Sequence, residues 1–306
     1  MHYAYPPLSP DRYLLADNNL MPNQNRKHTV IPGGDPAIEA IELPLLLDAM
    51  FRCYGYDFRD YAENSFKRRL AKAIRAEGAT SLSAFQDLIL HRPEAMLRFL
   101  DIVTVETTVM FRDPQLYRVL RELIVPELRL LGPLRVWHAG CSTGEEVYSM
   151  ALLLHEAGLL ERTRIYATDV STQAIEKGKT AVFPLKHMRE YTANYQQAGG
   201  QTAFSNYYTA KGDSIILRDA LRRNIVWAEH NLVTDSSFNE FQVICCRNVL
   251  IYFNRSLQDR VHRLLYDSLA VGGLLALGRG ETIRFTPCED RYEGVDLETK
   301  LYRKVA

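Results

Sequence analysis

The chain lacks long apolar runs and has no excess of charge of either sign. Its cysteines are odd in number, so they cannot all pair with one another. No stretch approaches the ~18 apolar residues of a membrane-spanning helix, and the first residues lack the basic and apolar regions of a signal peptide. Basic side chains number 37 and acidic side chains 37, which argues against nucleic-acid binding driven by bulk charge. The five cysteines match no zinc spacing. We expect a cytoplasmic protein with reduced cysteines, no metal and no membrane insertion.

The length of 306 residues, 47% of them hydrophobic, is enough for two domains. Residues 1–36 are rich in proline and asparagine, which predicts a poorly ordered extension. Residues 37–113 show helical periodicity, with Ser81 as a helix cap and Pro93 at a helix start, and predict a small helical domain. Residues 114–133 predict a linker helix.

From residue 134 to residue 306, strand-like and helical segments alternate. The strand-like runs are RVWHA, RIYATDV, NIVWAEHNL, FQVICCRN and GLLALG, and the last helical pattern is SLQDRVHRLLYDSLAVGG. This alternation predicts a parallel sheet that helices cover on both faces. Residues 183–223 are polar and tyrosine-rich and interrupt the alternation, which predicts an inserted subdomain.

The run VWHAGCSTGEEVYS combines a strand, a turn with Gly140 and Gly144, and a helix start. Such a turn lets the backbone approach a nucleotide-like ligand. Because the helix begins with Glu145 and Glu146, a pyrophosphate is disfavoured and a ligand with a cationic amino-acid end is favoured. Asp169, at the end of the second strand, can accept hydrogen bonds from a ribose diol. The pattern favours S-adenosylmethionine; a tight strand-to-helix turn with a surface aspartate is the alternative.

Polar side chains also follow the third and fourth predicted strands. Asn231 and Leu232 close the third strand, and Arg247 and Asn248 close the fourth. Because the carboxyl ends of parallel strands meet at one edge of a sheet, we expect these residues to converge on one crevice. For Asn231, ordinary turn chemistry remains an alternative.

Five ordered motifs resemble the chemotaxis receptor methyltransferases, the CheR family: TVETTVMFRD, CSTGEEVYS, ATDVS, HNLV and CRNVLIYF. The resemblance covers about residues 41–306. It implies an α/β fold, a class I S-adenosylmethionine-dependent methyltransferase with a Rossmann-like sheet, an N-terminal all-helical domain and a small inserted antiparallel β-subdomain. It also implies methyl transfer to glutamate side chains of chemoreceptors, which forms methyl esters and S-adenosylhomocysteine.

The resemblance implies roles for single residues. Arg112 and Tyr252 are the catalytic candidates, with Tyr252 near the transferring methyl group. The alternatives are a helix-capping or salt-bridge arginine and a core tyrosine. Glu106 stands where relatives often carry asparagine, and it can accept a hydrogen bond but not donate one. The candidate cofactor-binding residues are Glu106, Thr108, Arg112, Gly140, Gly144, Glu145, Glu146, Asp169, Asn231, Leu232, Arg247 and Asn248.

The methyl acceptor is expected to be a protein. A glutamate carboxylate is anionic at neutral pH, so the reaction needs no general base. His138, His155 and His230 are therefore expected to be structural. Arg68, Lys72 and Arg75 form a basic stripe at helical spacing that suits an acidic receptor helix; a solvated face is the alternative. An edge strand of the inserted subdomain could bind a receptor-tail peptide. We expect a monomer. A cofactor-sensing regulator and a small-molecule methyltransferase are the alternative functions.

Overall fold

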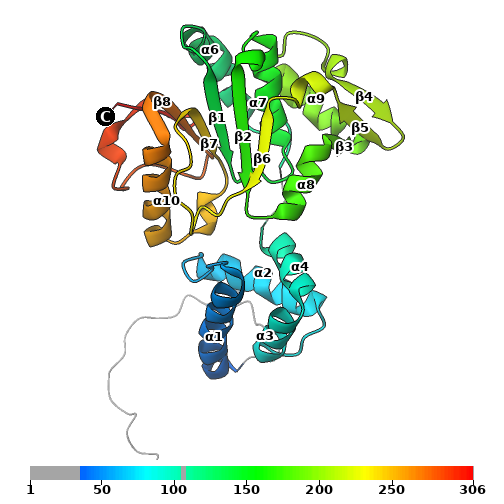
Figure 1. Cartoon of the computed structure of the whole chain (residues 1–306), viewed down its shortest axis with the longest axis vertical. Coiled ribbons are helices and arrows are strands. Elements are labelled where there is room, and N and C mark those ends of the chain that lie inside the picture. The colour runs from blue at the N-terminus through cyan, green and yellow to red at the C-terminus, as the bar shows by residue number, and fades with distance from the viewer. Residues whose placement is uncertain (1–34, 105–107, 306) are drawn as a thin grey trace, which may run out of the picture.

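Four helices form the N-terminal domain in the computed structural model, which describes residues 35–104 and 108–305. Helix α1 packs on α3, and α2 packs on α4. Their shared core is apolar, and the domain lies below the sheet domain in Figure 1. The helices are α1 (Pro36–Tyr54), α2 (Glu63–Ala76), α3 (Leu82–His91) and α4 (Pro93–Val103).

Local signals set the ends of these helices. The Ser81 side chain accepts a hydrogen bond from the Ala84 amide, which confirms the predicted cap of α3. Pro93 is the first residue of α4, where its missing N–H is not needed. Helix α1 ends at Gly55, whose φ of 77° is the left-handed conformation that glycine adopts without strain.

A helical linker region connects the two domains. It consists of α5 (Pro114–Val119), a π-helical turn (Leu120–Ile124) and α6 (Val125–Leu128). Most of its apolar side chains enter the larger core of the sheet domain. The linker therefore belongs structurally to the C-terminal domain.

Seven strands form the main sheet. In sheet order they are β6 (Ile225–Glu229), β2 (Thr163–Asp169), β1 (Leu134–Ala139), β7 (Phe241–Cys246), β8 (Leu269–Leu277), β10 (Leu301–Lys304) and β9 (Tyr292–Asp296). The first five run parallel, whereas β10 pairs antiparallel with both β8 and β9. The sheet is therefore mixed, and the sequence pattern missed its last two strands.

Helices cover both faces of the sheet. Val136 of β1 faces the core beneath the linker and α7 (Glu145–Glu156), whereas the next residue, Trp137, faces the core beneath α10 (Arg255–Ser268). This alternation is the two-residue period of a strand. The helical pattern that predicts a helix as far as Gly273 is wrong at its end, because Leu269 already pairs with Phe241 in the sheet.

The inserted subdomain contains a second, antiparallel sheet. Its strands, in order, are β3 (Val182–Pro184), β5 (Ser214–Leu217) and β4 (Tyr208–Lys211). Helix α9 (Met188–Gln197) lies beside it, and α8 (Thr172–Thr180) precedes it. Short 3₁₀ turns cover Leu160–Arg162, Leu185–His187, Phe204–Tyr207, Asp219–Leu221, Leu250–Tyr252 and Glu289–Arg291.

The helical domain faces the carboxyl ends of the parallel strands (Figure 1). The backbone N–H of Ala62 donates to the Tyr252 carbonyl at 2.8 Å, and the N–H of Asn254 donates to the Asp60 carbonyl at 2.8 Å. These contacts place α2 beside the loop that follows β7. No helix among the described residues is long and apolar enough to cross a membrane.

Candidate active site

A cleft opens where the strand order changes direction. The chain leaves β1 for β2 on one side and later returns to β7 on the other side, so the loops after these strands diverge around a crevice. Both domains contribute to the walls. The lining residues are Tyr61, Val103, Thr104, Gly140, Ser142, Asp169, Val170, Ala174, His230, Asn231, Leu232, Val233, Asn248, Val249, Tyr252 and Phe253.

The two predicted glycines of the first loop serve different purposes. Gly140 lines the cleft with a φ of 78°, and a Cβ at this position would overlap a methyl group of Val249. Gly144 has a φ of 92°, and its Cβ would lie 2.6 Å from the Trp227 ring. Gly144 is not among the residues that line the cleft, so its absent side chain allows packing within the domain instead.

Asp169 is at the cleft and holds the glycine loop in place. One carboxylate oxygen accepts the Ser142 N–H at 2.8 Å, and the other accepts the Ser171 N–H at 3.0 Å. The Ser142 hydroxyl lines the cleft and is buried, with no hydrogen-bond partner among the described residues. A buried hydroxyl of this kind fits a polar ligand group. Sequence reasoning missed Ser142, although it lies inside the glycine motif.

Asn231 and Leu232 form the wall beyond β6. The Asn231 side chain accepts the Val233 N–H at 3.0 Å, and its backbone N–H donates to Asp235 at 2.8 Å. Asn231 therefore shapes a turn and lines the cleft at the same time. The Leu232 side chain supplies an apolar surface beside it.

A second hollow adjoins the first. The two share Gly140, Ser142, Asn248 and Tyr252. The second one is bounded further by residues from the segment before α5, from the loop after β1 and the start of α7, and from the turn after β7. These residues are Thr108, Arg112, Cys141, Glu146, Arg247 and Ile251. Predicted cofactor and catalytic residues from three separate segments of the chain thus meet at one place.

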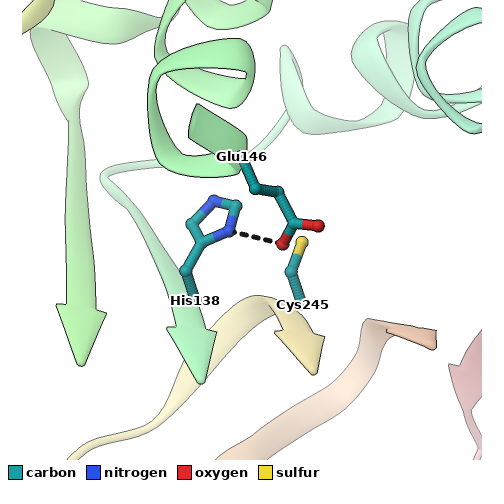
Figure 2. Close-up of side chains that lie close together, drawn as sticks. All are labelled: His138, Glu146 and Cys245. Carbon is teal, nitrogen blue, oxygen red and sulfur yellow. Dashed lines mark hydrogen bonds and ion pairs between the residues drawn. The ribbon is translucent and has the colours of Figure 1, made fainter. Parts of the chain in front are cut away.

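Glu146 and Arg247 form a buried ion pair in this second hollow. The Arg247 guanidinium lies 2.8 Å from Glu146 and 2.6 Å from Asp113. The His138 ring donates to the other oxygen of Glu146 at 2.9 Å (Figure 2). Burial alone would raise the pKa of Glu146, but Arg247 and His138 outweigh it and lower that pKa to about 2. Glu146 is therefore a carboxylate at all physiological pH values.

The side chain of Glu145, the residue before Glu146, lies away from the second hollow. It accepts hydrogen bonds from Thr143 at 2.7 Å and from the buried Tyr191 of α9 at 3.3 Å. It is not among the residues that line either hollow. The two adjacent acids of the motif therefore face different parts of the domain.

His138, Glu146 and Cys245 lie close enough together to resemble a metal site (Figure 2). The chemistry of the group argues against a cation. Burial raises the pKa of the Cys245 thiol well above its ordinary value, so the thiolate is disfavoured. The Glu146 carboxylate is already neutralised by the Arg247 guanidinium, which would repel a cation. We interpret His138 and Cys245 as neighbours that hold the Glu146 side chain in place.

The backbone around the second hollow is strained. Phe111, Asp113 and Asn248 all have φ between 53° and 61°, and none of them is glycine. Such conformations persist only where surrounding contacts enforce them, and they gather at functional sites. The Phe111 N–H is held by the Ser149 hydroxyl at 2.8 Å, and Asp113 is held by Arg247.

Tyr252 lines both hollows, and its ring is packed from the side of the helical domain. The Arg69 guanidinium of α2 lies 4.3 Å from the ring centroid. Arg69 also donates to the Val103 carbonyl and to Ser65. Because Arg69 is buried and makes these contacts, it supports the wall of the site on the side of the helical domain.

The basic stripe itself is exposed on α2. Arg68, Lys72 and Arg75 all face solvent, while the opposite face of the helix enters the domain core. None of the three lines the cleft. Their exposed position outside the cleft would allow contact with a large partner.

Comparison with known proteins identifies the family. Residues 41–104 match the all-alpha domain of the CheR methyltransferases, and residues 106–299 match their SAM-binding domain. The chain belongs to the CheR methyltransferase family. It is a chemotaxis-type methyltransferase by family, with S-adenosylmethionine as its cofactor.

Relatives of this CheR-family chain extend along most of its length. A Pseudomonas putida protein named methyltransferase Cher3 is 45% identical over 264 residues, which are 86% of this chain and 97% of the relative. A chemotaxis protein methyltransferase of Listeria innocua is 29% identical over 76% of this chain and 86% of its own. The N-methyltransferase NodS from Bradyrhizobium japonicum, solved with S-adenosyl-L-homocysteine, is a distant likeness, with 17% identity, a TM-score of 0.32, and coverage of 58% of this chain and 63% of NodS.

The residues of the CheR-family cleft fit this cofactor. Asp169 offers carboxylate oxygens, Ser142 offers a buried hydroxyl without a partner among the described residues, and Leu232 offers an apolar wall. The ion-paired Glu146 lines the adjoining hollow. The predicted cofactor-binding residue Glu106 lies outside the described residues.

Proposed function

We propose that this CheR-family chain transfers a methyl group from S-adenosylmethionine to glutamate side chains of chemoreceptors. Methyl esters and S-adenosylhomocysteine would be the products. The observation that supports this most is the meeting of Arg112, Asn248 and Tyr252 in a hollow that adjoins the Asp169 cleft. The reaction would take place in the cytoplasm, with a monomeric enzyme.

The chain's residues would divide the work of holding the cofactor. Asp169 would accept hydrogen bonds from the ribose, because it lines the cleft and a carboxylate oxygen can accept more than one hydrogen bond. Asn231 and Leu232 would border the adenosine part. Thr108, Arg112, Glu146, Arg247 and Asn248 would border the methionine part.

The chemistry places few demands on the protein. The bound cofactor supplies a methyl group on a positively charged sulfur, which leaves as a neutral thioether when an acceptor oxygen takes the methyl group. A glutamate carboxylate is already anionic at neutral pH, so a general base is unnecessary. The protein must align the acceptor and exclude water.

Arg112 and Tyr252 are the residues placed to align the acceptor. Arg112 can bind a carboxylate with the fixed geometry of a guanidinium. Tyr252 presents a hydroxyl and a ring at the junction of the two hollows. Since Arg69 lies over the Tyr252 ring, that residue would hold the tyrosine in place as the acceptor enters.

The exposed face of α2 is the proposed docking surface for the acceptor helix. Arg68, Lys72 and Arg75 are exposed there, and complementary charge guides an acidic helix to its site. Strand β4 is an edge of the small sheet and could pair with a receptor-tail peptide. These two surfaces would bind the receptor outside the cleft.

The test uses the purified protein, radiolabelled S-adenosylmethionine and a chemoreceptor cytoplasmic domain. We expect base-labile methyl ester on the receptor. Reversing two charges of α2 (Lys72→Glu with Arg75→Glu) should lower receptor methylation at least tenfold and leave S-adenosylhomocysteine affinity unchanged. The matched control reverses Arg164 and Arg263, which are exposed basic residues outside α2.

Each alternative predicts a different result. A cofactor-sensing regulator would bind S-adenosylhomocysteine but transfer no methyl to any receptor. A small-molecule methyltransferase would methylate a low-molecular-weight acceptor, with activity unaffected by the α2 charge reversal. Absence of base-labile methyl on the receptor would rule out the proposed reaction.

A further inference from the structure

Glu281 binds the turn that follows β7 although no sequence motif points to it. Its side chain is 5% exposed. One oxygen accepts the N–H groups of Val249 and Leu250, each at 2.8 Å. The other accepts the N–H groups of Asn248 at 2.9 Å and Gly278 at 2.6 Å. A single buried carboxylate thus receives four backbone donors.

Three of these donors belong to the turn that lines the active site. Asn248 borders both hollows, and Val249 borders the cofactor cleft. Asn248 has a left-handed φ of 61°, which a non-glycine residue keeps only under constraint. The hydrogen bonds to Glu281 supply that constraint directly.

Gly278 makes the approach of Glu281 possible. A Cβ on Gly278 would lie 2.7 Å from the Glu281 oxygen and 2.8 Å from the Asn248 nitrogen. The same loop reaches the linker side of the site, because the Arg279 side chain lies 2.9 Å from Asp113. Asp113 follows Arg112 in the chain. The loop after β8 therefore contacts both segments that carry the predicted catalytic residues.

We propose that Glu281 is a positioning residue of the active site, which holds Asn248 against the cofactor and sets the start of the turn that ends at Tyr252. It acts through these residues and is not itself among the residues that line the cleft. The expected effect of Glu281 on cofactor affinity requires only that the chain binds S-adenosylmethionine, the cofactor of its family. The consequence for methyl transfer rests on the proposed function.

The decisive variant is Glu281→Gln in the full chain. Glutamine keeps the length of the side chain, but its NH₂ group must face two of the backbone donors, so part of the turn loses its anchor. We expect S-adenosylhomocysteine affinity, measured by calorimetry, to fall about tenfold. Amide hydrogen exchange of the ligand-free protein should quicken over residues 247–252. The control is Glu298→Gln, which makes the same change at an exposed site.

A second variant perturbs the same turn without changing Glu281. Gly278→Ala leaves the carboxylate intact and should reproduce both effects by crowding Asn248. If a variant is partly unfolded, the ligand-induced rise in Tm still gives the affinity of its folded fraction. An affinity loss below threefold in both variants overturns the proposal, as does unchanged exchange over residues 247–252. The two proposals can fail separately. If the variants lose cofactor affinity tenfold but the wild-type protein methylates no receptor, the positioning role of Glu281 stands and the proposed function is rejected.

Discussion

Arg247 and Glu146 form an ion pair that joins the end of β7 to the start of α7. The two side chains meet at 2.8 Å, and the Arg247 side chain is only 2% exposed. Because an unpaired buried guanidinium is strongly unfavourable, the two residues depend on each other. The pair explains how Glu146, at a helix N-terminus, can border the proposed cofactor site with its negative charge neutralised.

Replacing Glu146 by glutamine should destabilise the protein in a pH-dependent way. The pKa of Glu146 is lowered to about 2, so its carboxylate stabilises the folded state above the ordinary pKa of 4.5, and this contribution disappears as the pH falls towards 2. At pH 7 we expect Glu146→Gln to lower the free energy of unfolding by up to about 3 kcal/mol. Urea unfolding at pH 7 and at pH 3 measures the difference, which should shrink at pH 3. Glu161→Gln, at an exposed position, is the control; an equal loss at both pH values would contradict the argument.

Replacing Asp169 by asparagine should weaken cofactor binding. The asparagine NH₂ group would face a backbone donor of the loop at Ser142 or at Ser171, and the charge offered to the ribose would be lost. Bonds to charged groups contribute roughly 1.5–3 kcal/mol, so the affinity for S-adenosylhomocysteine should fall about tenfold or more. Calorimetry measures this, with Asp213→Asn on an exposed turn as the control. Unchanged affinity would remove Asp169 from the proposed binding set.

Replacing Gly140 by alanine separates backbone strain from crowding. Alanine at a φ of 78° is strained by about 1–2 kcal/mol, and here its Cβ would also overlap Val249. Gly158 has a φ of 70° but open space around a Cβ, so Gly158→Ala reports the strain alone. We expect Gly140→Ala to lose about 1–3 kcal/mol more stability in chemical unfolding. Adding Val249→Ala should recover part of that excess; no recovery would show that the crowding argument is wrong.

The sequence predicts which residues at the strand ends line the cleft. Asp169, Asn231 and Asn248 each follow an apolar run, and parallel strands bring such positions to one edge. The glycine turn after β1 can be predicted from the sequence equally well. These signals are local, because each needs only a strand and the residues that follow it.

Other features of the site leave no local signal. Glu281 lies 33 residues after Asn248 and contacts it through backbone groups, which no periodicity records. Glu145 and Glu146 are neighbours in the motif, yet successive helical residues point about 100° apart, so one enters the site and the other binds Tyr191. Strands β9 and β10 were missed because they are short and rich in polar residues.

Replacing Tyr252 by phenylalanine should separate catalysis from binding. The ring and its contact with Arg69 would remain, so the turn should keep its shape. Only the hydroxyl, placed where the two hollows join, would be lost. We expect kcat for receptor methylation to fall about tenfold, which corresponds to one hydrogen bond made in the transition state, while S-adenosylhomocysteine affinity stays within twofold.

The matched control for this last change is Tyr208→Phe on β4, which removes a hydroxyl from the inserted subdomain. If kcat is unchanged in Tyr252→Phe, the hydroxyl does not contact the acceptor and Tyr252 acts through its ring alone. A Tyr252→Leu variant would then lower both kcat and cofactor affinity, because leucine removes the surface on which Arg69 packs. The two variants together distinguish a group that touches the acceptor from one that shapes the hollow around it.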